Sequence, residues 1–220
     1  MNYQFWLMFC VKKIVRILSK FHIKINKKHI TTYIQATKMD NNDIIYGKMI
    51  TKEKRQELFG KVAGGAGSRS PEIYQCSMIE THTNNLCYKT NMRINLMTNQ
   101  LQEIAKPNIY NDGFNYSEDF DGCQIKNEKT IYINLKCIVG KGGAQTRSLR
   151  EVYWFIRGQL EVLQNEDNKN IYFANILDGD EAHFVMSKYI YLMNMYKNDN
   201  ILSRIFIGNL KDYITWYQDL

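Results

Sequence analysis

The sequence predicts an α/β fold, and the second half of the chain carries the pattern that predicts it. Between residues 123 and 216, stretches with the apolar alternation of strands are interleaved with longer stretches of helical period. Their order is strand, strand, helix, strand, helix, strand, which is typical of layered α/β architectures. The 220 residues suit one domain with an appendage and are enough to bury a proper core.

The first 50 residues are expected to form a basic extension and linker, ahead of a folded domain over residues 51–220. Seven of the 29 Lys and Arg residues lie within residues 1–30, which contain no acid. The remaining 22 are balanced by 22 acidic residues, so the positive charge belongs to this segment. Apolar residues recur at helical spacing over residues 3–30, which predicts a helical N-terminal part. Such a segment suits a DNA-binding arm, a membrane-surface helix or a weakly ordered extension.

Three helices are expected between residues 51 and 107. Thr51 can cap a helix over residues 52–62, which Gly64 and Gly65 end. Pro71 can begin a second helix that runs to residue 80. A third is expected over residues 91–105, and Pro107 would end it.

The second half predicts the sheet and its covering helices. Residues 123–125 and 130–139 form a strand pair joined by a turn over 126–129. A helix over 146–164, a buried strand over 171–177 and a helix over 181–196 follow. The order ends with a short strand over 204–207 and a helix over 210–216.

Cysteine usage and hydropathy limit the compartment. The five cysteines are odd in number and contain no CxxC pair, which indicates free thiols in a reducing, cytoplasmic setting. The longest uncharged apolar stretch, residues 5–11, is too short to span a bilayer, so no membrane partner is expected. The N-terminus is unlike a secretory signal, because its apolar residues precede its basic ones.

A chemical site is indicated where the strand pair closes. Asp121 precedes the first strand and Lys136 lies near the end of the second, so a hairpin brings the two together. Phosphodiester cleavage needs carboxylates that hold Mg²⁺, and a lysine can stabilise hydroxide and developing charge. The ordinary alternatives are a simple Asp121-Gly122 turn and a lysine that faces solvent.

These residues resemble the PD-(D/E)XK nuclease superfamily, in particular Type II restriction endonucleases. The resemblance covers residues 70–220 and rests on three features: Glu118-Asp119-Phe120-Asp121-Gly122, Ile131-Tyr132-Ile133-Asn134-Leu135-Lys136, and the element order that follows. It implies a central mixed sheet flanked by helices, Mg²⁺ as cofactor, and a homodimer that cleaves double-stranded DNA. A companion DNA methyltransferase in the same system is the further partner it implies.

Two positions depart from the family pattern. Phe120 replaces the family's proline, and Asn134 replaces the acid of the ExK strand. Some members carry that acid on the following helix, which points to Glu151, 15 residues after Lys136. The expected catalytic set is therefore Asp121, Lys136 and Glu151, with Asn134 as a weak metal ligand and Glu80 as a reserve acid. Glu151 can instead pair with a neighbouring arginine or favour the helix N-terminus.

The glycine-rich segment Gly140–Gly143 follows the strand that carries Lys136. A glycine-rich turn before a helix is a ready anion site, although the Walker pattern is absent. In a nuclease its neighbours would contact the DNA backbone or bases, and the expected DNA-binding residues are Lys141, Gln145, Thr146, Arg147 and Arg150. The alternative is a tight connection that needs glycine.

Two further features have ordinary explanations. Asp178-Gly179-Asp180-Glu181 is expected to end a strand and cap the next helix. Tyr153-Trp154-Phe155 is expected to belong to the core or a dimer interface. The function predicted is thus a Mg²⁺-dependent, sequence-specific DNA endonuclease. The alternatives are a non-catalytic DNA-binding relative and a nucleotide- or phosphate-binding enzyme that uses Gly140–Gly143.

Overall fold

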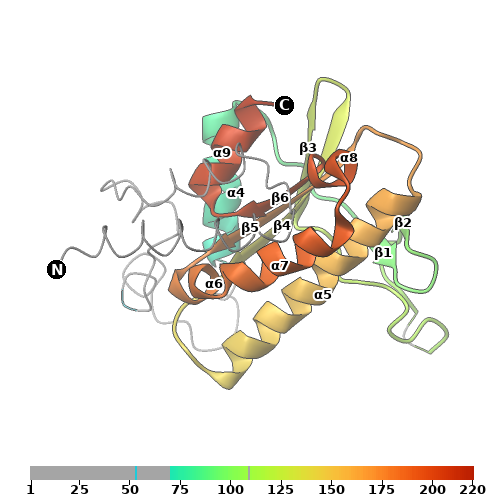
Figure 1. The fold of residues 1–220 in the computed structure, drawn as a ribbon, viewed down its shortest axis with the longest axis horizontal. Helices are drawn as coiled ribbons and strands as arrows, with labels where there is room; N and C mark the ends of the chain where they lie inside the picture. Colours follow the sequence, from blue (N-terminus) through green and yellow to red (C-terminus); the bar gives the residue numbers. More distant parts are fainter. Residues whose placement is uncertain (1–52, 54–69, 109) are drawn as a thin grey trace, which may run out of the picture. The chain divides into compact units, whose positions relative to one another are not determined.

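The computed structural model describes residue 53, residues 70–108 and residues 110–220 (Figure 1). All of them belong to one compact unit, Asp40–Leu220. The elements expected over residues 3–30, 31–48 and 52–62 lie outside these described residues, apart from residue 53. No helix in the described part is both long and apolar enough to cross a membrane.

A four-stranded mixed sheet forms the centre of this unit, which confirms the predicted α/β class with a central sheet flanked by helices. Its strands are β3 (Gly122–Lys126), β4 (Lys129–Cys137), β5 (Ile171–Asp178) and β6 (Ile205–Gly208), in that spatial order. β3 and β4 are antiparallel and joined by a tight turn, whereas β4, β5 and β6 run parallel. Parallel neighbours need crossover connections, and helices supply them here.

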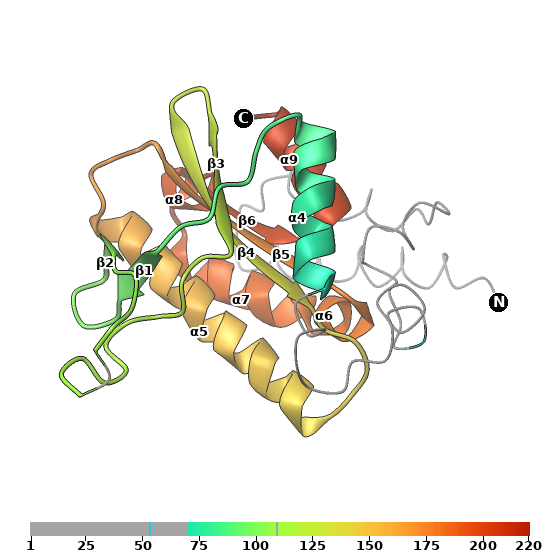
Figure 2. The same ribbon diagram turned by 180° about the vertical axis from the view of Figure 1, so that it is seen from behind.

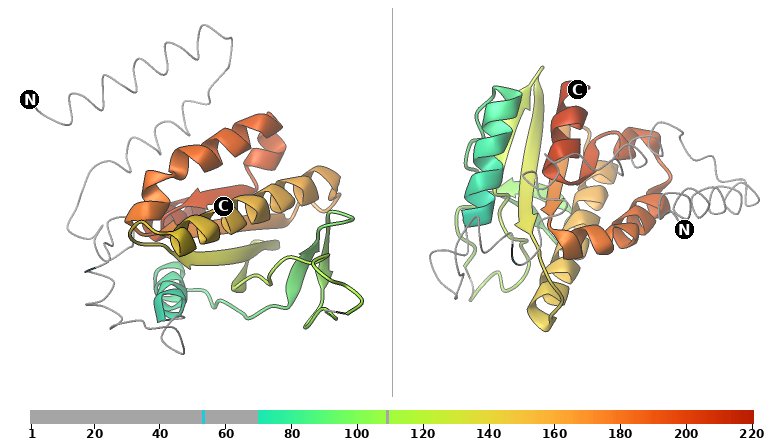
Figure 3. Two further views of the ribbon diagram at one scale, coloured as in Figure 1. Left: turned by 90° about the horizontal axis from the view of Figure 1, so that it is seen from below. Right: turned by 90° about the vertical axis from the view of Figure 1, so that its left-hand side faces the viewer.

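Helices cover both faces of the sheet. α4 (Ser70–Thr83) and α9 (Leu210–Gln218) lie side by side on one face (Figure 2). Helices α5 (Gly143–Asn165), α7 (Met186–Tyr196) and α8 (Asp199–Leu202) cover the other face, and α6 (Asp180–Phe184) follows β5. Figure 3 shows the strands between α4 and the helices α5 and α7. The two faces of the sheet therefore have separate hydrophobic clusters.

The strand alternation explains these two clusters. Ile131, Ile133 and Leu135 point from β4 toward α4 and α9, whereas Tyr132 packs on the α5 side. Of the predicted aromatic run on α5, Tyr153 and Phe155 pack against the core. Trp154 is exposed and lies beside Arg157, so only part of the run is core.

The helix predicted over residues 91–105 is wrong. The structure has a small antiparallel sheet there, β1 (Met92–Asn95) and β2 (Gln100–Glu103), which packs against α5. The Asn95 side chain accepts hydrogen bonds from the backbone N–H groups of Met97 and Thr98, and Asn99 has a φ of 54°. Asparagine favours such turns, so local turn chemistry replaces the helix.

The single helix predicted over residues 181–196 is divided in two. α6 ends at Phe184, and Val185 stands between it and α7. Gly179, before α6, has a φ of 102°, and a Cβ there would collide with the carbonyl oxygen of Ile138. Only glycine suits this close backbone approach.

The C-terminal end of α9 is held by the β3–β4 hairpin. Lys126 donates to the carbonyls of Tyr217 and Gln218, and Lys129 donates to that of Leu220 at 2.6 Å. The last carbonyls of a helix lack intrahelical partners, and cations there interact favourably with the helix dipole.

Candidate functional site

Phe120 fixes the chain just before Asp121. It is 2% exposed, and its ring lies 5.4 Å from that of Phe173 on β5 and 4.9 Å from that of Phe155 on α5. Burying an aromatic ring of this size stabilises the local backbone strongly. Phe120 therefore has a structural role as the anchor of this segment.

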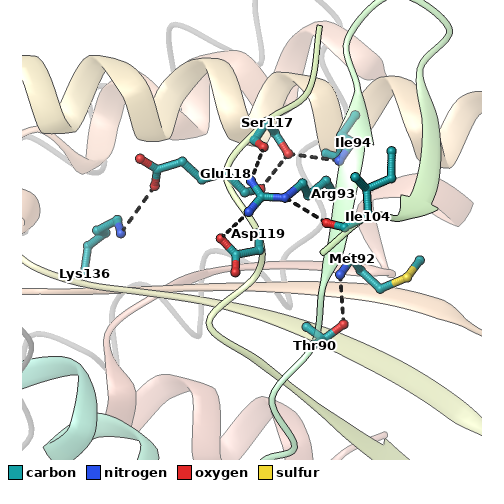
Figure 4. Close-up of polar contacts among 9 residues, drawn as sticks. All are labelled: Thr90, Met92, Arg93, Ile94, Ile104, Ser117, Glu118, Asp119 and Lys136. Atoms are coloured by element: carbon teal, nitrogen blue, oxygen red, sulfur yellow. Dashed lines mark hydrogen bonds and ion pairs between the residues drawn. The ribbon is translucent and has the colours of Figure 1, made fainter. Parts of the chain in front are cut away.

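Arg93 on β1 holds the segment 117–119 that precedes this anchor (Figure 4). Its guanidinium donates to the carbonyls of Ile104 and Ser117 and pairs with the Asp119 carboxylate at 3.0 Å. The small sheet thus positions the chain from which Glu118 projects toward Lys136 in Figure 4.

The Asp121 carboxylate lies at the junction of β3 and β4. Its Oδ2 accepts a hydrogen bond from the backbone N–H of Leu135 at 2.7 Å. Burial raises the pKa of Asp121, against the opposing effects of the Lys136 charge and the Leu135 N–H. The Glu118 and Asp119 carboxylates raise this pKa further. Asp121 is therefore a partly desolvated carboxylate within the electrostatic reach of a lysine, as the hairpin argument predicted.

Lys136 is surrounded by carboxylates. Its Nζ lies 3.8 Å from an oxygen of Glu72 on α4 and 4.0 Å from an oxygen of Glu118. The Lys136 side chain is 25% exposed. Glu72, Glu118, Asp121 and Lys136 together form what we call the lysine–carboxylate cluster. It joins residues from α4, from the segment before β3, and from β4.

Asn134 does not belong to this cluster. It is 3% exposed, and its amide donates to Oδ1 of Asn175 at 3.1 Å. Gln159 on α5 exchanges two hydrogen bonds with Asn175, at 2.6 and 3.0 Å, so the three amides form one buried network. The role of metal ligand predicted for Asn134 is not supported by this arrangement, because its amide is buried and already hydrogen-bonded to Asn175.

Neither of the other two expected acids lies in the cluster. Glu151 is exposed between the buried Leu149 and Val152 on α5, so the helical period directs it away from the sheet. The charges in the described part that shift the pKa of Asp121 are Lys136, Glu118 and Asp119, and Glu151 is not among them. Glu80 on α4 accepts from the backbone N–H of Cys87 at 2.9 Å. The structure thus offers Glu118 and Glu72 in place of Glu151.

The carboxylates of the cluster are of the chemical kind that Mg²⁺ prefers, and this ion is commonly held by one or two carboxylates with several waters. Asp121 and Glu118 interact electrostatically and would be such a pair. Within residues 70–108 and 110–220, no group of three or more His, Cys, Asp or Glu side chains could hold a metal.

The expected DNA-binding residues lie at the start of α5. Lys141, Thr146, Arg147 and Arg150 are exposed or partly exposed, and Gln145 is partly buried. The N-cap position is Gly142, no side chain caps the helix, and its first turn contains no acid. The free N–H groups and the basic side chains therefore present positive potential to solvent. Lys141 Nζ also lies 4.9 Å above the ring of Phe184.

Comparison with known proteins gives no match. No protein-family model matches the chain, and no curated protein or solved structure is significantly similar to it. The resemblance to PD-(D/E)XK nucleases stays a prediction that rests on residues and element order.

Two members of the cluster were not expected from the sequence. Glu118 lies three residues before Asp121, and the sequence alone does not show whether Glu118 or Asp119 approaches Lys136. Glu72 follows Pro71 in the first turn of α4, where an acid is ordinary because the helix dipole favours it. Its approach to Lys136 depends on the packing of α4 across β4, which no local pattern contains.

Proposed function

We propose that this protein is a Mg²⁺-dependent endonuclease that cleaves double-stranded DNA, with sequence specificity of the Type II restriction kind. The observation that supports the proposal is the partly desolvated Asp121 carboxylate, which interacts electrostatically with the Lys136 ammonium and accepts the Leu135 N–H where β3 meets β4. Hydrolysis of a phosphodiester needs charge stabilisation at phosphorus and a positioned water, and lysine can supply both.

Each residue of the cluster has a distinct role in this proposal. Asp121 and Glu118 would hold Mg²⁺, which supplies Lewis-acid stabilisation of the phosphate when bound. Lys136 would orient the attacking water and stabilise charge on the phosphoryl oxygens. Glu72, 3.8 Å from the Lys136 Nζ, would fix the direction of the ammonium.

The start of α5 would bind the DNA backbone. Lys141, Arg147 and Arg150 are suited to phosphates, whereas Gln145 and Arg147 are side chains able to read base edges. α5 begins at Gly143, soon after β4 ends at Cys137, so the proposed DNA-binding residues follow Lys136 closely in the sequence. We also propose a homodimer, as the resemblance implies, because two copies would supply one active site for each DNA strand.

A cleavage assay on a DNA library with Mg²⁺, read by sequencing the ends, tests the activity and its specificity together. We expect Asp121→Asn and Lys136→Met to lower cleavage by about 10²–10⁴-fold. Glu118→Gln should lower it less, and Glu151→Gln is the matched control on α5 that should leave it unchanged. Absence of cleavage by the wild-type protein, or full cleavage by Asp121→Asn and Lys136→Met, would contradict the proposal.

A second candidate function is DNA binding without catalysis. It is favoured by the amide network of Asn134, which places a structural side chain where the family has a metal ligand. Binding that weakens steeply with salt, and that loses part of its salt slope in Lys141→Ala, would occur under both hypotheses. Only this second hypothesis predicts that saturating DNA binding occurs with no cleavage under any divalent ion.

A further inference from the structure

A buried carboxyl group and a buried amide lie directly behind Lys136. Asp178 ends β5 and is 1% exposed, and Gln75 on α4 is 2% exposed. The Gln75 Nε2 donates to the Asp178 Oδ2 at 2.7 Å and also lies 3.3 Å from the backbone carbonyl oxygen of Lys136. The Asp178 Oδ1 accepts from the backbone N–H of Leu210, the first residue of α9, at 3.0 Å. One side-chain pair therefore connects α4, β4, β5 and α9.

The Gln75 Oε1 is the only buried side-chain nitrogen or oxygen in the described part that has no hydrogen-bond partner. An unpaired buried acceptor is costly, and such atoms are rare in folded proteins. A glutamine amide can rotate by half a turn and exchange the positions of its oxygen and nitrogen. After such a rotation Oε1 would face Asp178 and could accept a hydrogen bond from its carboxylic acid O–H, while Nε2 would take the position where Oε1 now has no partner.

The surroundings of Asp178 favour this protonated form. Burial raises its pKa to about 7, although the Leu210 N–H and the Gln75 amide lower it. Of the charged groups on the elements packed around it, Asp212 on α9 raises this pKa. The others are Lys211 on α9, Lys129 and Lys136 on β4, and Glu72 and Glu80 on α4, with Glu72 beside Lys136. Asp180, the first residue of α6, accepts hydrogen bonds from the backbone N–H groups of Gly140 and Glu181.

We propose that Gln75 is a positioning residue for Lys136, and that the protonation state of Asp178 sets its orientation. When Asp178 is a carboxylate, Nε2 donates to it and to the Lys136 carbonyl, which ties β4 to α4. When Asp178 is protonated, its O–H donates to Oε1, and the rotated amide withdraws Nε2 from the Lys136 carbonyl. The strand that carries the lysine then loses one buried hydrogen bond. The effect on catalysis rests on the proposed function, whereas the coupling of the two side chains does not.

An NMR titration of the full-length wild-type protein tests the coupling without any substitution. The probes are the Asp178 carboxyl carbon, the Gln75 side-chain amide, and the backbone amide of Cys137, which shares a peptide group with the Lys136 carbonyl. We expect all three to titrate with one midpoint near neutral pH. A Gln75 amide and a Cys137 amide that stay constant while Asp178 titrates would overturn the proposal.

Asp178→Asn supplies the functional arm, since asparagine can donate to Oε1 and resembles the protonated acid at every pH. Its cleavage rate should lack the wild-type inflection near neutral pH and be lower by about ten- to a hundredfold at pH 8, with unchanged KM for DNA. Asp212→Asn, the matched control, should keep the inflection and move it to lower pH. An inflection retained in Asp178→Asn would refute the role of this pair. If the wild type cleaves no DNA, the proposed function fails and the NMR titration alone decides this inference.

Discussion

Replacing Asn134 by aspartate would restore the acid of the family pattern, and the structure predicts that this change destabilises the protein. The carboxylate would face Oδ1 of Asn175, which now accepts the Asn134 amide at 3.1 Å. Two acceptors would then oppose each other, because the Asn175 amide is engaged by Gln159 at 2.6 Å. The site is 3% exposed, so water cannot compensate.

The expected magnitude depends on pH. A lost hydrogen bond with an unsatisfied buried group costs about 1–3 kcal/mol, and an unpaired buried charge raises the total to about 3–5 kcal/mol. The introduced acid would have a raised pKa in the folded state, since its protonated form can donate to Asn175. The native state then binds more protons than the unfolded state, so stability is lost as pH rises from about 4 through the folded pKa. Every tenfold difference in proton affinity between the folded and unfolded states corresponds to about 1.4 kcal/mol.

Urea denaturation of the full-length protein at pH 5 and pH 8, followed by tryptophan fluorescence, measures the effect. We expect Asn134→Asp to lower the free energy of unfolding by about 3–5 kcal/mol at pH 8. At pH 5 the loss should be smaller than at pH 8, by about 1.4 kcal/mol or more. Asn194→Asp, on the exposed side of α7, is the control and should change the free energy of unfolding by about 0.5 kcal/mol or less. Equal stability of Asn134→Asp and wild type at pH 8 would refute this reasoning, and stabilisation of the variant by Mg²⁺ would indicate that position 134 faces a metal site.

Three other predictions concern a glycine, a cysteine pair and the buried aspartate. Gly179→Ala should lower the free energy of unfolding by more than about 2 kcal/mol, because a Cβ there collides with the backbone. Gly113→Ala is the control, since Gly113 has a φ of 53° with open space around it, and it should lower this free energy by about 1 kcal/mol. Similar losses in the two variants would refute the collision. Cys76 should be alkylated faster than Cys87, because the hydrogen bond between the two thiols lowers the pKa of Cys76 and raises the pKa of Cys87. Mass spectrometry of the labelled peptides measures the two rates, and preferential labelling of Cys87 would contradict the prediction. Stability of the wild type should fall as pH rises from about 4 to 7, because burial raises the pKa of Asp178 to about 7 and its native form retains a proton; urea midpoints for Asp178→Asn should lack that part of the decline, and identical pH profiles would count against it.

Strong local periodicity made the centre of the fold predictable. The alternation of Ile131, Ile133 and Leu135 predicted β4, and the long helical period after Gly143 predicted α5. The helix predicted over residues 91–105 was wrong because the turn chemistry of Asn95 and Asn99 favours a strand pair there. Boundaries that depend on glycine or asparagine geometry were the weakest.

The site was predictable only as far as the chain itself brings residues together. Asp121 and Lys136 share a hairpin, so their proximity follows from register. Glu72 lies 64 positions before Lys136 in the sequence and approaches it because α4 packs on β4. The spacing of residues along the chain does not predict this packing. Glu151 was expected by analogy, but the helical phase set by Leu149 and Val152 turns it outward.

The contacts from Lys126 and Lys129 to the end of α9 bear on how the molecule folds. These two lysines of the β3–β4 hairpin bridge a sequence separation of 91 residues. Contacts between such distant segments slow folding, because the intervening chain must be ordered before they form. The hairpin edge should therefore acquire its full protection from hydrogen exchange late, together with α9, and the two should open as one cooperative unit. Asp121, which directly precedes β3, would then reach its final position only when α9 has packed against the sheet.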